Sequence, residues 1–91
     1  HAAAHQGHRR LGLLAVTELL EFLVESLVED PSAVVVEELE EDGDLVYEIT
    51  VAEDDLGRVI GKGGRVANAI RTIAKAAAVR LDRRVIVDIL D

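Results

Sequence analysis

The spacing of apolar residues in the first third of the chain predicts an amphipathic helix. From residue 13 to about residue 29 the apolar side chains recur at helical spacing, and glutamates occupy the other side. Pro31 ends this segment, because its ring cannot donate a backbone hydrogen bond and it restricts the residue before it. We expect the helix to cover one face of a sheet with the stripe Val16, Leu19, Leu20, Leu23 and Leu27.

Two stretches after Pro31 have the apolar patterns of β-strands. Residues 33–39 are rich in valine, and residues 44–51 place every second side chain, beginning with Leu45, on one apolar face. Glu41-Asp42-Gly43 lies between them and has the chemistry of a tight turn. The pattern predicts a β-hairpin, and we interpret the acidic residues near its turn as a solvated tip that discourages edge-to-edge association.

The second half of the chain contains two helical patterns and one strand pattern. Residues 53–55 are acidic and are expected to cap a short helix over residues 56–60. A longer helix is predicted from Arg65 to about Leu81, and residues 85–90 alternate as in a last strand. The order is therefore α-β-β-α-α-β, an α+β fold. The expected apolar stripe of the longer helix is Ile70, Ile73, Ala74, Ala77 and Leu81.

The length of 91 residues suits one small domain with a single core. We expect this domain to span residues 13–91 and residues 1–12 to be a flexible tail or a remnant of cloning. A metal site at His1, His5 and His8 is the less favoured interpretation, since a flexible tail has no second shell to hold ligands. We therefore expect no metal and no cofactor. The lack of cysteine fits the cytoplasm, and no apolar stretch is long enough to cross a bilayer.

Charge is distributed unevenly along the chain. The net charge is −8, which by itself argues against a nucleic-acid-binding protein. Residues 56–84, however, contain eight cationic side chains and one acidic one, a net charge of +7, which leaves −15 for the remainder. Any binding of a polyanion would therefore be local to the cationic segment.

The run Val-Ile-Gly-Lys-Gly-Gly-Arg, residues 59–65, lies between the two helices predicted for the second half. We call residues 61–64 the glycine turn. Gly61 and Gly64 allow a positive φ and a close approach of backbone N–H groups to a ligand. Lys62, Arg65 and Arg58 add positive charge beside the N-terminus of a helix. This combination favours an anion such as the phosphate of a nucleic acid.

Three other interpretations of the glycine turn fit the residues less well. A P-loop needs four residues between its first glycine and the Gly-Lys pair, whereas three separate Gly57 from Gly61. A dinucleotide-binding fingerprint directly follows a strand, whereas a helix is expected before these glycines. A purely structural corner, with Gly61 as a helix cap, stays open, although such a cap requires none of the three cations.

The glycine turn resembles the GxxG loop of KH domains in the pattern Val-Ile-Gly-x-x-Gly. With the order α-β-β-α-α-β and the segments VIGKGGRVANAIRT and KAAAVR, the chain is similar over about residues 15–90 to the small bacterial single-KH-domain proteins of the KhpA family. The resemblance implies a type II KH domain, in which three helices cover one face of a three-stranded sheet. The overall acidity and the N-terminal tail depart from the family pattern.

The resemblance implies binding of single-stranded RNA in the cytoplasm. KH domains clamp about four nucleotides with their GxxG loop. It also implies self-association, a larger partner of the KhpB or Jag type, and a role as a post-transcriptional regulator or RNA chaperone that affects cell shape. Carried onto this chain, the clamp is Gly61, Lys62, Gly63 and Gly64, and the base-contacting groove is lined by Val59, Ile60, Val66 and Ile70.

Two other classes of function compete with RNA binding. An enzyme is not expected, because the chain has no cysteine, no histidine after His8 and only two serines. A protein-interaction module, whose acidic helix and hairpin dock a basic partner, is the alternative. The two aromatic residues, Phe22 and Tyr47, are expected in the core or on the sheet surface, so aromatic stacking does not drive binding.

Overall fold

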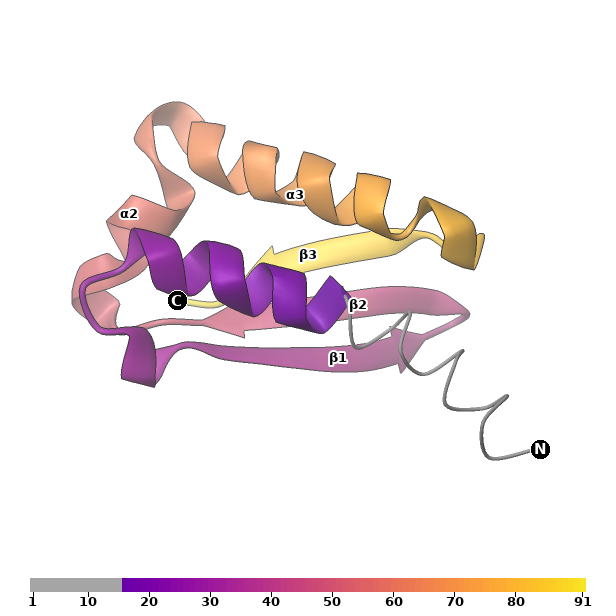
Figure 1. Ribbon diagram of the computed structural model, residues 1–91, viewed down its shortest axis with the longest axis horizontal. Coiled ribbons are helices and arrows are strands. Elements are labelled where there is room, and N and C mark those ends of the chain that lie inside the picture. Colours follow the sequence, from indigo (N-terminus) through magenta and orange to yellow (C-terminus); the bar gives the residue numbers. More distant parts are fainter. Residues whose placement is uncertain (1–15) are drawn as a thin grey trace.

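The computed structural model describes residues 16–91 and has the predicted order of helices and strands (Figure 1). The expectations for the tail, residues 1–12, and for the tail histidines lie outside the described residues. The main elements are the N-terminal helix over residues 16–27, β1 Val35–Glu41, β2 Asp44–Thr50, α2 Leu56–Ile60, α3 Arg65–Ala77 and β3 Val85–Ile89. Single 3-10 turns lie at Pro31–Ala33, Glu53–Asp55, Lys62–Gly64 and Val79–Leu81.

The three strands form one mixed sheet in the order β1-β2-β3. β1 and β2 are antiparallel and are joined by Asp42 and Gly43, which both have positive φ, as a two-residue hairpin turn requires. β2 and β3 are parallel, so the chain must cross over between them, and α2 and α3 provide this connection. All three helices lie on one side of the sheet (Figure 1), which confirms the predicted α+β fold.

The core lies between the helices and the covered face of the sheet. β2 contributes Leu45, Tyr47 and Ile49, all of them buried, as the alternation predicts. The Tyr47 hydroxyl donates a hydrogen bond to the Glu38 carboxylate at 3.2 Å. Burial, followed by the negative charge of Glu38, raises the pKa of this phenol, because both disfavour the phenolate.

The helices use narrower apolar stripes than the sequence predicts. The N-terminal helix buries one row of residues four apart, Val16, Leu20 and Val24, while Leu27 and Phe22 are exposed. Phe22, expected in the core or on the sheet, is 68% exposed. A helix in a two-layer domain meets the sheet along one row, so its flanking side chains face away. The same holds for α3, which buries Ala67, Ile70 and Ala74 and exposes Ile73 and Ala77.

The acidic residues before α2 have a different role from the predicted cap. Asp55 has helical backbone angles, φ −96° and ψ −7°, whereas a capping residue is extended, and its side chain makes no capping hydrogen bond to a backbone N–H group of α2. Its buried carboxylate instead accepts hydrogen bonds from the backbone N–H groups of Glu29 at 3.0 Å and Asp30 at 3.1 Å, and from the Arg58 guanidinium at 2.8 Å. Asp55 therefore ties α2 to the chain that follows the N-terminal helix.

Candidate nucleic-acid interface

The glycine turn is an exposed corner between α2 and α3. α2 ends at Gly61, whose backbone, at φ 76° and ψ 172°, leaves the helical region. Gly63 and Gly64 both adopt left-handed angles, with φ of 65° and 80°, and α3 begins at Arg65. Three positive φ values in four residues require glycine-rich sequence, since other residues rarely adopt them.

The backbone N–H groups of this corner are divided between internal and outward-facing ones. The N–H of Gly61 donates to the Gly57 carbonyl at 2.8 Å, and that of Gly64 donates to the Gly61 carbonyl at 3.1 Å. In the described part of the chain, the N–H groups of Lys62 and Gly63 donate to no backbone carbonyl. Both residues are exposed, so two adjacent donors are open to an anion at the start of a 13-residue helix.

The glycines of the turn differ in the space available for a side chain. A Cβ on Gly61 would lie 2.4 Å from Cγ2 of Val66 and 2.9 Å from the Val66 nitrogen, so the position has no space for a side chain. A Cβ on Gly63 or Gly64 would meet nothing within 4 Å. Gly61 thus closes the corner against α3, whereas Gly63 leaves its outer side open.

The predicted cations fall into two groups. Lys62 and Arg65 are exposed and form no ion pair within the described residues. Arg58, in contrast, pairs with the buried Asp55 and with Glu29. The hydrogen bonds that Asp55 accepts, first of all from the backbone N–H groups of Glu29 and Asp30 and then from Arg58, hold the pKa of the Asp55 carboxyl below its ordinary value. The charge of Arg58 is therefore largely balanced within the protein.

The predicted groove residues are also divided by burial. Val59 and Ile70 are fully enclosed in the core, with exposures of 0% and 3%. Val66 is half-buried against that core, and Ile60 is 37% exposed. The reason is the shortness of α2: its five residues present one side to the core, so Val59 faces inward and its neighbour Ile60 faces outward. Of these four predicted groove residues, Ile60 and Val66 are the two that offer apolar surface beside the turn.

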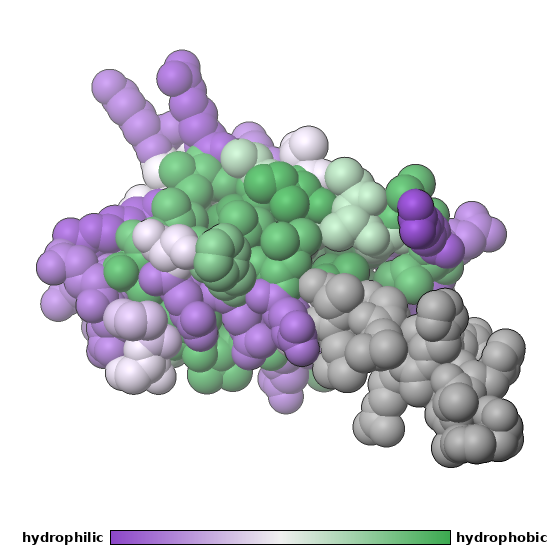
Figure 2. Space-filling model, in the orientation of Figure 1, coloured by the Kyte–Doolittle hydropathy of each residue, from purple (hydrophilic) through white to green (hydrophobic). Residues whose placement is uncertain are grey.

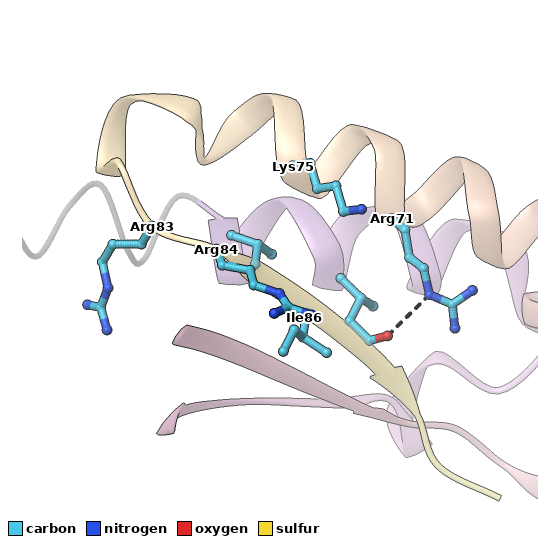
Figure 3. Close-up of a pocket in the computed structure, with 7 residues that line it drawn as sticks. Arg71, Lys75, Arg83, Arg84 and Ile86 are labelled. Atoms are coloured by element: carbon cyan, nitrogen blue, oxygen red, sulfur yellow. Dashed lines mark hydrogen bonds between the residues drawn. The ribbon is translucent and has the colours of Figure 1, made fainter. Parts of the chain in front are cut away.

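A cationic cavity of about 390 Å³ lies between α3 and β3 (Figure 3). No sequence pattern singled it out as a site. The cations were visible in the local charge of +7, but nothing in the linear sequence brings the middle of α3 beside the start of β3. The cavity is lined by Arg71, Lys75, Arg83, Arg84, Val85, Ile86 and Val87.

Polar and apolar side chains occupy different parts of the surface. Figure 2 shows long hydrophilic side chains projecting at the end of the molecule where Figure 1 places the connection between α2 and α3. Apolar side chains gather over the helices in the same view. Phe22 of the N-terminal helix and Ile73 of α3 are 68% and 40% exposed. Among the described residues there is no helix long and apolar enough to cross a membrane and no cluster of three metal-ligating side chains.

Comparison with known proteins agrees with this architecture. An RNA-binding protein KhpA of Clostridium acetobutylicum is 48% identical over 73 residues, which cover 80% of this chain and 97% of that protein. Proteins of the same name from Caldanaerobacter subterraneus and Borreliella burgdorferi are 47% and 42% identical over 73 and 74 residues; the matches cover 80% and 81% of this chain and 97% and 90% of those proteins. None of these names is that of an enzyme.

Fold similarity extends to a larger protein. The crystal structure of an Aquifex aeolicus Era variant bound to GDP.AlF4- matches with a TM-score of 0.58 and 24% identity, over 84% of this chain and 29% of that one. At this identity the likeness concerns the fold alone. The family model described as "KhpA/KhpB, KH domain" matches residues 17–89. With this match, the α-β-β-α-α-β order and the glycine turn, the chain belongs to the KhpA/KhpB family of KH domains.

Proposed function

We propose that this protein binds single-stranded RNA at the glycine turn. The observation that carries the proposal is that the N–H groups of the exposed residues Lys62 and Gly63 have no backbone acceptor among the described residues, with the unpaired cations Lys62 and Arg65 beside them. Backbone donors and cations at a helix N-terminus suit a phosphate group. The names of the KhpA relatives, which are RNA-binding proteins, support RNA as the ligand.

Each residue of the predicted site receives a role from its position. Lys62, Gly63 and Arg65 contact phosphates, and Gly61 and Gly64 shape the corner. Ile60 and Val66 supply the apolar contact for a base, since they are the accessible members of the predicted groove. The buried Val59 and Ile70 support the two helices from within, and Arg58 fixes α2 through Asp55.

Binding by a single domain should be weak and sensitive to salt. Tyr47 is buried and Phe22 lies on the N-terminal helix, so neither is placed beside the turn to stack on a base. Without stacking, phosphate contacts carry most of the affinity, so salt weakens binding. Each phosphate contact contributes about −0.7 to the slope of log affinity against log salt concentration. Fluorescence anisotropy with labelled RNA at several salt concentrations measures this slope.

The decisive variants are Gly63→Asp and Gly63→Asn. Both side chains have nearly the same shape, both tolerate the left-handed backbone angles of Gly63, and both find open space there. Only Asp places a negative charge against the phosphate. We expect Gly63→Asp to bind RNA about tenfold more weakly than Gly63→Asn, a difference of about 1.4 kcal/mol, because like charges about 4 Å apart at a protein surface repel each other by roughly 1–4 kcal/mol.

Equal affinity of the two variants would remove the glycine turn from the RNA-binding site. No binding by the wild-type protein even at low salt would favour the alternative function, a protein-interaction module with an acidic docking surface. Thermal unfolding of both variants, which we expect at closely similar temperatures, verifies that the comparison concerns binding and not folding.

The remaining features of the function are also proposals. We infer that the protein acts in the cytoplasm as a post-transcriptional regulator or RNA chaperone, as a homodimer or with a partner of the KhpB or Jag type. A weak single site gains affinity when two are linked, because the second contact benefits from a high effective concentration. The exposed apolar side chains over the helices (Figure 2) would be covered by such a contact. Sedimentation at increasing protein concentration, with Phe22→Glu as the variant, tests self-association.

A further inference from the structure

A second cavity, of about 650 Å³, lies where β2 and β3 end beside the start of α2. It is lined by Thr50, Val51, Glu53, Leu56, Leu90 and Asp91. Its two charged residues, Glu53 and Asp91, are exposed, and within the described residues their side chains form no hydrogen bond or ion pair. Apolar walls with acidic groups at the rim suit an aliphatic stem with a cationic end, as in a lysine or arginine side chain.

The cavity is continuous with the face of the sheet that the helices leave bare. The helices pack on the face that carries Leu45, Tyr47 and Ile49 (Figure 1), so the alternate residues of β2 lie on the opposite face. We call this opposite face the uncovered face. Thr50, the last residue of β2, belongs to the uncovered face and also lines the cavity.

Two rows of side chains cross the uncovered face from β1 to β3. In the register of the sheet the apolar row consists of Leu39, Val46 and Ile86, and the acidic row of Glu37, Glu48 and Asp88. Neighbouring strands lie about 4.8 Å apart, so each row is about 10 Å long, and the two rows are about 7 Å apart along the strands.

The acidic row has a cost for the free domain. Its three carboxylates lie directly opposite one another, and none of them forms an ion pair within the described part of the chain. Like charges at opposite positions destabilise a sheet. A cationic partner would remove this repulsion, whereas a phosphate would add to it.

We propose that the cavity and the uncovered face form a docking surface for a basic amphipathic helix of a partner protein. A helix laid across the strands presents residues three and four apart about every 4.5–6 Å, close to the spacing between the strands. Its apolar stripe meets the apolar row, and its lysines and arginines meet the acidic row. One of these cations enters the cavity beside Glu53. Complementary charge selects a basic partner and excludes RNA from this surface.

The docking surface does not depend on the proposed RNA contact. The glycine turn belongs to the layer of helices, on the other side of the sheet from the two rows (Figure 1). α2 also separates the two sites, because the cavity lies at its first residue, Leu56, and the turn follows its last, Ile60. A partner helix and an RNA strand are therefore bound at the same time.

The probe for this surface is a fluorescently labelled peptide of leucine, alanine and lysine, about 15 residues or four helical turns long, with one apolar stripe beside one lysine stripe. A peptide of the same composition in scrambled order is the control. We expect the full chain to bind the patterned peptide about tenfold more tightly at low salt, as measured by anisotropy. Nuclear magnetic resonance should locate the contact at Val46, Ile86 and Leu90. Equal binding of the two peptides, or no binding of the patterned one, would overturn the docking surface.

Glu48→Lys and Glu53→Lys reverse one charge in the acidic row and one in the cavity. Glu25→Lys is the matched control, because Glu25 is exposed on the N-terminal helix and makes the same change in net charge. We expect each of the first two variants to bind the patterned peptide about tenfold more weakly than the control does, since an attraction becomes a repulsion. The melting temperature of Glu48→Lys should not fall below that of the wild type, because the substitution removes repulsion between strands. An equal loss in all three variants would overturn the docking surface in favour of a general attraction to an acidic chain.

RNA distinguishes this proposal from that of the glycine turn. We expect Glu48→Lys and Glu25→Lys to bind single-stranded RNA equally well, and Gly63→Asp to bind the patterned peptide as the wild type does. Displacement of the peptide by RNA would place the peptide at the turn and overturn the docking surface. Unchanged RNA binding by Gly63→Asp, beside intact peptide binding, would instead overturn only the function proposed for the turn.

Discussion

The hairpin turn between β1 and β2 and the glycine turn between α2 and α3 are similar in backbone and opposite in chemistry. Both are exposed corners built on glycine at positive φ, Gly43 at 85° and Gly63 at 65°. At the hairpin turn the carbonyl of Gly43 faces outward and accepts a hydrogen bond from Arg83. At the glycine turn the N–H groups of the exposed residues Lys62 and Gly63 have no backbone acceptor among the described residues.

The difference shows that glycine geometry alone does not make a binding site. An exposed carbonyl among carboxylates attracts cations, and the hairpin turn already holds the guanidinium of Arg83, which also pairs with Glu40. Exposed N–H groups beside Lys62 and Arg65 attract anions. The polarity of the free backbone groups and the charge of the adjacent side chains, taken together, distinguish a candidate RNA contact from a structural turn.

The largest effect on stability is expected for Gly61→Ala. The new Cβ would lie 2.4 Å from Val66 at a backbone conformation that suits only glycine, and we expect a loss of about 3 kcal/mol in the free energy of unfolding. Denaturant unfolding measures this loss. Gly57→Ala is the matched control on α2, because its Cβ meets nothing within 4 Å. Equal stability of the two variants would contradict the closed corner.

Acid should weaken the support of the glycine turn through Asp55. Its pKa is lowered in the folded protein, so its contribution to stability is fully present above its unfolded pKa of about 3.9 and is lost as the pH falls through the lower folded value. Asp55→Asn also places an amide against two backbone N–H donors. The difference in melting temperature between this variant and the wild type should therefore be largest above about pH 4 and shrink below it.

The exposed Asp54→Asn serves as the control for the acid experiment, since the Asp54 side chain makes no hydrogen bond among the described residues. We expect its melting temperature to follow that of the wild type across the same pH range. A difference between Asp55→Asn and the wild type that stays constant far below the unfolded pKa would show that the carboxylate charge is not what ties α2 to the chain that follows the N-terminal helix.

A smaller loss is expected for Gly43→Ala at the hairpin turn. Gly43 has positive φ, but a Cβ there would meet no neighbouring atom. Only the cost of a left-handed backbone applies, a loss of about 1 kcal/mol in the free energy of unfolding. RNA affinity should be unchanged, because the carboxylates around this turn repel phosphate. Denaturant unfolding and anisotropy measure the two quantities. Weaker RNA binding by Gly43→Ala would contradict the contrast between the two turns.

The smallest effect is expected for Arg83→Ala. The Arg83 side chain is 27% exposed and its partner Glu40 is 64% exposed, and ion pairs near the surface contribute roughly 0–1 kcal/mol. Because its guanidinium is held by the hairpin, RNA affinity measured by anisotropy should be unchanged. A clear loss of RNA affinity would show that Arg83 leaves the hairpin to contact RNA.

Local patterns in the sequence predicted most of the fold. Alternation of apolar residues located β2 to within a residue, and the glycine turn separated α2 from α3 at Gly61. The ends of elements were less accurate: the helix expected to reach Leu81 ends at Ala77, where a 3-10 turn follows. Helical periodicity extends into such a turn, because its residues keep nearly the same spacing.

The sequence predicted only part of the candidate site, because it indicates which residues form the turn but not which neighbouring side chains are buried. Lys62, Gly63 and Arg65 are exposed as expected, because a tight turn leaves its side chains in solvent. Val59 and Ile70, predicted to line the groove, are buried in the core. The five residues of α2 are too few for their pattern to show that Val59 faces the sheet, whereas Ile70 lies on the apolar stripe expected for α3. The ion pair of Arg58 with Glu29 joins positions 29 residues apart, a contact that no local pattern reveals.

By itself the sequence determined the order of the elements, the separation of charge along the chain and the position of the glycine turn, because these depend on residues close to one another. The tertiary structure alone decided which apolar side chains are buried, that Asp55 ties α2 to the chain after the N-terminal helix, and that cations of α3 and β3 share one cavity. The physical reason is that burial and long-range pairing arise only when the parallel crossover places distant segments side by side.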